Sequence, residues 1–186
     1  MPILPHGLPI PFVLPRVESL LDIGAGIRPQ TMVSSPKHVC VEPHFEYVEA
    51  LKEAGYEVIP ETWRALEAMP DGCFDAVLAL DIIEHLPKDE GFELIAEAER
   101  VASKFVLFFT PLGFVSQHCE GTDSWGLHGC EWQEHRSGWM PEDFPGYEFD
   151  YIDNDVTGQR EAFFALTVKG KSCKSHTPQP TRCRTS

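Results

Sequence analysis

The sequence predicts an α/β fold in which a doubly wound, mostly parallel sheet of about seven strands ends in an antiparallel hairpin. Three observations support this prediction. Short apolar runs alternate with segments of helical periodicity, these runs have the length of buried strands, and two β-prone runs near the end flank a polar turn. A chain of 186 residues, 42% of them apolar, is long enough for one substantial core and too short for two ordinary domains.

The first two strands are predicted at residues 18–23 and 38–41. The run ESLLDI stops at Gly24, as a buried parallel strand does when the chain turns sharply. The run at 38–41 ends at Glu42, and residues 45–54 then show apolar side chains at helical spacing. Strand, turn, strand and helix in this order are typical of the first part of a doubly wound sheet.

A third strand is predicted at residues 56–59 and a fourth at 74–80, where FDAVLAL is continuously apolar after Asp75. Continuous apolar runs are typical of strands that are covered on both faces. Residues 63–69 predict a short helical or irregular link between these strands, and residues 91–101 have helical spacing.

The last part of the predicted domain combines strands with a long irregular segment. The run KFVLFF at 104–109 predicts a fifth strand, and residues 147–152 and 162–168 predict the closing hairpin. Residues 112–146 show no sustained period and exceed ordinary loop lengths, which usually indicates a lid or a substrate-binding segment.

The charge is distributed unevenly along the chain. We expect one domain at residues 18–168, between a Pro-rich arm at 1–17 and a disordered tail at 169–186. The formal net charge is −14, and the tail holds five basic residues and no acid, so the remainder carries −19. Because DNA and RNA are bound by basic surfaces, this charge disfavours a nucleic-acid substrate and favours a small-molecule or glycan acceptor.

The sequence predicts neither a membrane span nor a secretion signal. No apolar stretch approaches the roughly 18 residues that a span needs, and the N-terminus lacks a basic segment, so we expect no membrane contact and a cytoplasmic location. The six cysteines include no CxxC pair, and we expect no disulfide framework.

The turns after the first two strands hold candidate binding residues. In the run DIGAG at 22–26, the glycines let the backbone approach a ligand because they have no Cβ, although a tight turn alone is the alternative. Eighteen residues after Gly24, Glu42 ends the second strand, where a carboxylate binds ribose hydroxyls in nucleotide-binding sheets. The alternative is an acid that caps the helix beginning near Pro43.

The glycine loop departs from the dinucleotide-binding pattern. Such a loop usually has a third glycine a few residues further on, and this chain has Arg28 and Pro29 there. S-adenosylmethionine has no pyrophosphate and tolerates the change, and Asp22 beside the loop is placed to bind its cationic or ammonium group. NAD is therefore the weaker alternative.

Four motifs together resemble a known family. The runs LLDIGAG, VEP, FDAVLALDIIEHLP and FFTP, in this order over residues 18–111, resemble the small class I (Rossmann-like) S-adenosylmethionine-dependent methyltransferases, with a looser match up to residue 168. The resemblance implies S-adenosyl-L-methionine as the cofactor. The cofactor-binding residues that it implies are Asp22, Gly24, Ala25, Gly26, Glu42, Pro43, Thr62, Trp63, Asp81 and Ile82.

Within that resemblance, the glycine loop lies under the methionine part, the acid after the second strand binds ribose, and residues after the third strand flank adenine. Thr62 or Trp63 stands where the family often has an acid, which is a departure from its pattern. Two roles remain open for Trp63: it stacks on adenine or it fills the core.

Two histidines are candidates for catalysis. His85 follows the fourth strand, and His135 lies in residues 133–144, which resemble the family's histidine, aromatic and helix-opening signature. Each is a candidate general base for the acceptor proton, and each has a structural alternative. Pro145 and Gly146 cut the expected helix short, so the family's acceptor is not carried over.

One set of residues has the side chains that zinc prefers, namely His118, Cys119, His128, Cys130 and His135. Their spacing lacks the paired ligands of familiar zinc sites, so no metal site is predicted.

The predicted function is methyl transfer from S-adenosyl-L-methionine to an O or N atom of a small molecule or sugar, catalysed mainly by alignment. Residues 112–146 are predicted to close over the acceptor, with Trp125, Trp132 and Trp139 as walls, unless these tryptophans only cover the sheet edge. Two further functions stay open: a non-catalytic methyltransferase-like module, which the shortened helix favours, and an NAD-dependent oxidoreductase.

Overall fold

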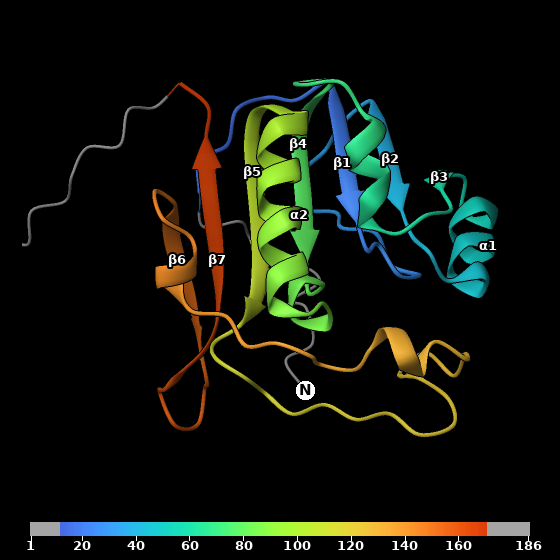
Figure 1. The fold of residues 1–186 in the computed structure, drawn as a ribbon, viewed down its shortest axis with the longest axis vertical. Helices are drawn as coiled ribbons and strands as arrows, with labels where there is room; N and C mark the ends of the chain where they lie inside the picture. The colour runs from blue at the N-terminus through green and yellow to red at the C-terminus, as the bar shows by residue number, and fades with distance from the viewer. Residues whose placement is uncertain (1–11, 171–186) are drawn as a thin grey trace, which may run out of the picture.

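The computed structural model describes residues 12–170 (Figure 1). The strands are β1 (Ser19–Ile23), β2 (Lys37–Val41), β3 (Glu57–Ile59), β4 (Phe74–Leu80), β5 (Ala102–Pro111), β6 (Glu148–Asp153) and β7 (Arg160–Val168). The α-helices are α1 (Phe45–Glu53) and α2 (Lys88–Val101), and the 3₁₀ turns are η1 (Trp63–Ala68), η2 (Ile83–His85), η3 (Cys130–Trp132) and η4 (Pro141–Asp143). Each predicted strand and helix is present, and the largest difference is the start of α2, at Lys88 rather than 91.

All seven strands form one sheet in the order β3-β2-β1-β4-β5-β7-β6. Strands β1 to β5 pair in parallel, and β7 runs antiparallel to both β5 and β6. The predicted fold class, with its closing antiparallel hairpin, is confirmed. The chain changes its direction of travel across the sheet between β1 and β4, and ligands of open α/β sheets bind outside the carboxyl ends of the strands at such a point.

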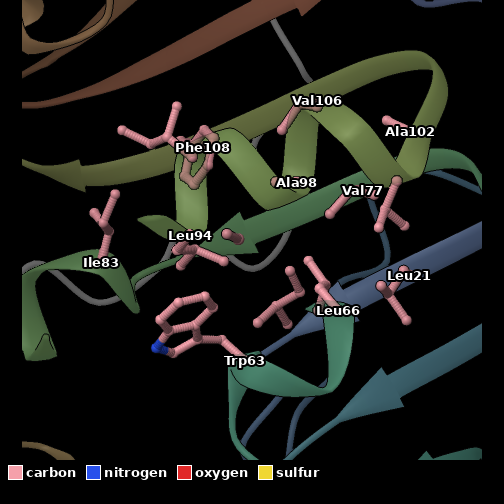
Figure 2. Close-up of a cluster of buried hydrophobic side chains, with 14 of the residues drawn as sticks. Leu21, Trp63, Leu66, Val77, Ile83, Leu94, Ala98, Ala102, Val106 and Phe108 are labelled. Carbon is pink, nitrogen blue, oxygen red and sulfur yellow. The ribbon is translucent and has the colours of Figure 1, made fainter. Parts of the chain in front are cut away.

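One face of the sheet packs against α2 and η1, and the two elements contribute apolar side chains at helical spacing to the same core. Fully burying one aliphatic or aromatic side chain of this kind stabilises the fold by about 1.5–3 kcal/mol. Figure 2 shows part of this core, including Leu21, Trp63, Leu66, Val77, Leu94, Ala98, Val106 and Phe108.

The opposite face is covered in two ways. Leu51 of α1 lies in one buried cluster with Cys40 of β2, so α1 covers this face near the β3 edge. Across β4 and β5, the apolar side chains pack with Phe12, Leu14 and Met32, which belong to extended or irregular chain. The sheet is therefore wound on both faces, although extended chain replaces an α-helix over part of the second face within residues 12–170.

The segment that joins β5 to β6 has little regular structure. Within residues 112–146, η3 and η4 are the helical turns, and the helix expected after His135 is a single turn, Pro141–Asp143. Figure 1 shows this segment, coloured yellow to orange, passing beneath the carboxyl ends of the parallel strands. The sequence-based expectation of an irregular segment with a shortened helix is confirmed.

The ends of the chain are only partly covered by the structure. Of the predicted Pro-rich arm, residues 12–17 are extended and Val17 is buried, whereas residues 1–11 lie outside the described part. Most of the predicted tail, residues 171–186, also lies outside it. Within the described part, none of the helices has the length and apolar character that crossing a membrane requires.

Candidate functional site

A cavity of about 630 Å³ lies outside the carboxyl ends of β1, β2, β3 and β4. What we call the strand-end wall is formed by Ile23, Gly24, Ala25, Gly26, Arg28, Val41, Glu42, Pro43, Tyr47, Thr62, Trp63, Arg64, Leu80, Asp81, Ile82, His85, Leu86, Pro87 and Glu90. What we call the lid wall is formed by Gln117, Ser124, Trp125, Glu131, Trp132, Gln133, His135 and Arg136.

The structure brings together almost all the residues that the sequence selected. Every residue predicted to bind the cofactor lines this cavity except Asp22, and both candidate catalytic histidines line it as well. Apart from His135, which lies between β5 and β6, these residues follow neighbouring parallel strands, whose carboxyl ends share one edge of the sheet.

Glu42 presents a buried carboxylate to the cavity. Its side chain accepts hydrogen bonds from the Gly26 N–H at 3.0 Å and from the His44 N–H at 2.9 Å. Burial raises the pKa of this carboxyl from 4.5 to about 7, and the two N–H donors act in the opposite direction. Each carboxylate oxygen has more than one acceptor site, so this group is able to receive further hydroxyl donors from the cavity.

Asp22 makes structural contacts within the protein. Along β1, Leu21 and Ile23 point to one face of the sheet, so the intervening Asp22 points to the other. Its carboxylate accepts a hydrogen bond from the Gln30 N–H at 3.0 Å and lies 3.1 Å from Nε2 of His38 in β2. Asp22 thus ties the loop after β1 to β2 and is not among the residues that line the cavity. Its contact with the cofactor stays a prediction.

The two loop glycines meet a steric requirement of the protein itself. Gly24 has φ +67° and Gly26 has φ +57°, values that disfavour residues with a side chain. A Cβ at Gly24 would lie 2.5 Å from Ile82 Cδ1, and one at Gly26 would lie 2.5 Å from Trp125 Cη2. Valine at either position is therefore expected to disturb the loop whether or not a ligand binds above it.

The end of β3 places Thr62 and Trp63 on the strand-end wall. The Thr62 hydroxyl accepts a hydrogen bond from the Arg64 N–H at 3.4 Å and so caps η1. Trp63 is buried in the core of Figure 2, yet it also lines the cavity, and the Arg64 guanidinium lies 4.5 Å from its ring centroid. The two roles left open for Trp63 are therefore compatible, and its contact with adenine stays a prediction.

Asp81 stands at the end of β4 in an uncommon backbone conformation. Its φ is +58°, and it is the one non-glycine residue with positive φ in the described part of the chain. Its N–H donates to the Phe109 carbonyl at 2.9 Å, which fixes the turn. Strained backbone of this kind clusters at functional sites, and here it lies on the cavity wall beside Ile82.

His85 and His135 meet where the two walls join. Their ring centroids are 4.9 Å apart in an edge-to-face arrangement. Nδ1 of His85 lies 3.1 Å from the Glu134 carbonyl, and Nδ1 of His135 lies 2.6 Å from the Val115 carbonyl. Burial lowers the pKa of His85 below 6.5, while backbone hydrogen bonds act in the opposite direction, so its imidazole is mainly neutral at pH 7.

Glu84 is a buried acid that the sequence pattern did not single out. Its carbonyl accepts hydrogen bonds from the Arg136 and Ser137 N–H groups, and its Oε2 accepts one from the Thr110 hydroxyl at 3.1 Å. Burial, and after it the charge of Asp81, raises the pKa of this carboxyl well above 4.5. The signal in the sequence was an acid directly before His85, at the end of an otherwise apolar run.

Trp139 anchors residues 112–146, which we call the lid segment, to the body of the protein. Its side chain is fully buried, and its Nε1–H contacts the Ile83 carbonyl at 3.1 Å and the Ser137 hydroxyl at 2.9 Å. Gly91 of α2 makes room for it, because a Cβ there would lie 2.2 Å from the indole ring. Trp139 therefore packs in the core and does not line the cavity, unlike the predicted cavity walls Trp125 and Trp132.

The tip of the lid segment is held by polar contacts and a disulfide. The Tyr47 hydroxyl of α1 donates to Asp123 at 2.5 Å, and Asp123 also accepts from the Trp125 N–H at 2.8 Å. Cys119 and Cys130 form a disulfide, with Cα atoms 5.1 Å apart. The sequence predicted no disulfide framework, and no spacing rule predicts that this segment folds back on itself. The same bond removes both thiols from the candidate zinc ligands of this segment.

Comparisons place this architecture among known folds, although no protein-family model and no curated protein matches the sequence. A S-adenosylmethionine-dependent methyltransferase from Archaeoglobus fulgidus is 14% identical with a TM-score of 0.57, and the match covers 82% of this chain and 86% of that one. One from Methanosarcina mazei is 14% identical with a TM-score of 0.59, covering 84% and 94%. The magnesium protoporphyrin IX methyltransferase of Synechocystis, solved with bound S-adenosylmethionine, is 10% identical with a TM-score of 0.53, covering 81% and 69%.

The chain has the fold of the class I S-adenosylmethionine-dependent methyltransferases. In this methyltransferase fold the glycine turn, Glu42 and Asp81 follow strands β1, β2 and β4 at the switch point of the sheet. The lid segment contributes the lining residues of the cavity that do not follow strands of the sheet.

Proposed function

We propose that the protein is a S-adenosylmethionine-dependent methyltransferase that acts on an O or N atom of a small-molecule or sugar acceptor. The observation that carries the proposal is the carboxylate of Glu42, which is buried, faces the cavity and is fixed by the Gly26 N–H of the adjacent glycine turn. A carboxylate in this position is suited to accept two hydrogen bonds from a ribose diol.

The remaining cofactor contacts follow from the order of strand ends. The methionine part of S-adenosylmethionine would lie over residues 24–26, with the acidic Asp81 on the same wall to attract its positive charge. Thr62 and Trp63, on the other side of Glu42, would flank adenine. The cavity volume of about 630 Å³ lies within the usual range of small-molecule sites, roughly 300–1,000 Å³.

The acceptor would enter between the strand-end wall and the lid wall. The sulfonium is already a reactive methyl donor, so alignment of the acceptor supplies most of the catalysis. Trp125 and Trp132 are placed to exclude water, and His135 or His85 would receive the proton that a hydroxyl acceptor releases. The net charge of −14 supports an acceptor other than DNA or RNA.

A non-catalytic module that binds the same cofactor is the second candidate. The single turn of η4, Pro141–Asp143, favours it, because the part of the chain after Trp139 offers little regular structure to hold an acceptor. This candidate predicts cofactor binding without turnover.

Two measurements test the proposal. Calorimetric titration with S-adenosylhomocysteine and, separately, with NAD is expected to show binding of the former alone, and binding of NAD alone would favour the oxidoreductase alternative. Incubation of the protein with a metabolite extract and methyl-labelled S-adenosylmethionine is expected to add one labelled methyl group to a metabolite. Binding of S-adenosylhomocysteine without any labelled product would support the non-catalytic module.

A further inference from the structure

Three ligand-bearing side chains meet at the junction of the two walls. Glu84, His85 and His135 each place one carboxylate oxygen or ring nitrogen within 4.8 Å of the other two. Glu84 and His85 belong to η2, and His135 belongs to the lid segment, 50 residues after His85. The packing of the lid on η2, through the Arg136 and Ser137 N–H groups, creates this group.

The two imidazoles are oriented as metal-ligating histidines usually are. A carbonyl oxygen only accepts, so Nδ1 of His85 donates to Glu134 and Nδ1 of His135 donates to Val115. In a neutral imidazole with the proton on Nδ1, the lone pair is on Nε2. A histidine that binds a metal almost always donates its other ring N–H to a carbonyl or carboxylate in this way.

The carboxylate of Glu84 provides an independent indication of a ligand. Its Oε2 receives the Thr110 hydroxyl, whereas Oε1 receives no N–H or O–H donor from the described residues, and its neighbour within hydrogen-bonding reach is a second carboxyl, that of Asp81. The residue is only 1% exposed, and Asp81 adds a second negative charge nearby. Leaving a buried polar atom unpaired is unfavourable, and a cation would satisfy the oxygen and offset the repulsion between the acids.

We propose that Glu84, His85 and His135 form a binding site for a divalent transition-metal ion of the Zn²⁺ type. One carboxylate and two imidazoles form the protein ligand set of several catalytic zinc sites, which keep the fourth position for water or substrate. His85 and His135 also line the cavity, so the open position would face the space where the acceptor enters.

A second group of potential metal ligands differs from the proposed site in its hydrogen bonding. Asp22, His38 and Cys40 are equally close together, but Asp22 and His38 already contact each other at 3.1 Å, and Asp22 also accepts the Gln30 N–H. None of their polar atoms is among the buried unpaired atoms of the described residues, unlike Oε1 of Glu84.

A metal at the proposed site would give the proposed function a more specific chemistry. An acceptor oxygen that completed the coordination shell would lose its proton more readily, so the ion favours a hydroxyl-bearing acceptor. This role rests on the proposed methyltransferase function, whereas the binding of the ion itself does not.

The test is a titration of chelator-treated, untagged protein with Zn²⁺ alone. We expect one ion to bind per chain by calorimetry, and Co²⁺ to give a visible absorption spectrum of nitrogen and oxygen ligation at the same stoichiometry. At a free Zn²⁺ concentration a hundredfold above Kd, the melting temperature is expected to rise by roughly 5–10 °C. Zn²⁺ affinity is expected to fall about 100-fold or more in His135→Gln and His85→Gln.

The matched controls are His118→Gln, on the exposed part of the same segment, and His38→Gln, in the second group, and both are expected to bind Zn²⁺ as the parent chain does. Glu84→Gln serves as a third ligand variant if its thermal unfolding remains cooperative. Absence of binding, unchanged affinity in both ligand variants, or loss in His38→Gln would overturn the proposal. S-adenosylhomocysteine titration of the metal-free protein separates the two ideas, because its failure would overturn the methyltransferase function and not the metal site.

Discussion

The two walls of the cavity are held in place by different kinds of contact. In the strand-end wall, the residue after β1, β2 or β4 donates its N–H to a carbonyl near the end of the neighbouring strand. Gly24 donates to Val41 at 2.8 Å, and Glu42 donates to Ile59 at 3.1 Å. Asp81 donates in the same way to Phe109 at 2.9 Å. Backbone hydrogen bonds that continue the sheet therefore position this wall.

The lid wall has no such ladder. Isolated backbone hydrogen bonds, such as those from Arg136 and Ser137 to the Glu84 carbonyl, and a few side chains hold it. Trp139 is buried under α2, Asp123 receives the Tyr47 hydroxyl, and Cys119 is bonded to Cys130. One half of the site therefore follows from the fold, whereas the other half depends on a few contacts between residues far apart in the sequence. A single substitution is therefore enough to remove each of those contacts.

Removing the Trp139 anchor of the lid segment is expected to destabilise the protein most. Trp139→Ala is expected to lower the free energy of unfolding by about 3–5 kcal/mol, because it empties a fully buried indole site and removes the hydrogen bond to Ile83. Trp132→Ala, at a side chain that is 39% exposed, is the control and is expected to cost less than about 1 kcal/mol. If urea denaturation shows equal losses of unfolding free energy in Trp139→Ala and Trp132→Ala, Trp139 does not anchor the segment.

The next effect concerns chemistry at the junction of the walls. His135→Gln keeps size and polarity but removes basicity and metal ligation, so methyl transfer is expected to fall about 100-fold or more while S-adenosylhomocysteine affinity stays near normal. His118→Gln, whose side chain is 75% exposed, is the matched control. Unchanged turnover in His135→Gln would assign this residue to packing.

The tip of the lid gives a smaller effect. Tyr47→Phe removes the hydroxyl that donates to Asp123 and is expected to cost about 1.5–3 kcal/mol, as for hydrogen bonds to a charged group. Amide exchange and protease cleavage are expected to increase within residues 118–132 and to remain unchanged in the sheet. Protection of this tip that is the same in Tyr47→Phe and the parent chain would show that other contacts hold the lid.

The pH dependence of binding tests the strand-end wall. Because the pKa of Glu42 is raised to about 7, its contribution to the stability of the ligand-free protein is present below pH 4.5 and is lost as the pH rises through about 7. Ribose hydroxyls prefer the ionised carboxylate, so S-adenosylhomocysteine affinity is expected to increase about tenfold from pH 6 to pH 8. Glu42→Gln should flatten this profile, and a parallel slope in the variant would assign it to another group.

The sequence predicted the strand-end wall better than the lid wall, because only the first is specified by local sequence signals. Apolar runs and turn residues are local signals, and parallel pairing then brings Gly24, Glu42 and Asp81 to one edge. The sequence pattern did not show which face Asp22 occupies relative to the cavity. The closure of Cys119 on Cys130 and the meeting of the histidines depend on the path of an aperiodic segment, which no local pattern determines.

Calorimetry of Glu42→Ala with S-adenosylhomocysteine tests whether Glu42 binds the ribose of S-adenosylmethionine. The exposed Glu53→Ala on α1 is the matched control, and thermal unfolding verifies that both variants are folded. We predict that Glu42→Ala loses about 1.5–3 kcal/mol of binding free energy, about 10- to 150-fold in Kd, while Glu53→Ala binds as the parent chain does. Equal affinity in the parent chain and in folded Glu42→Ala would show that Glu42 does not bind the ribose.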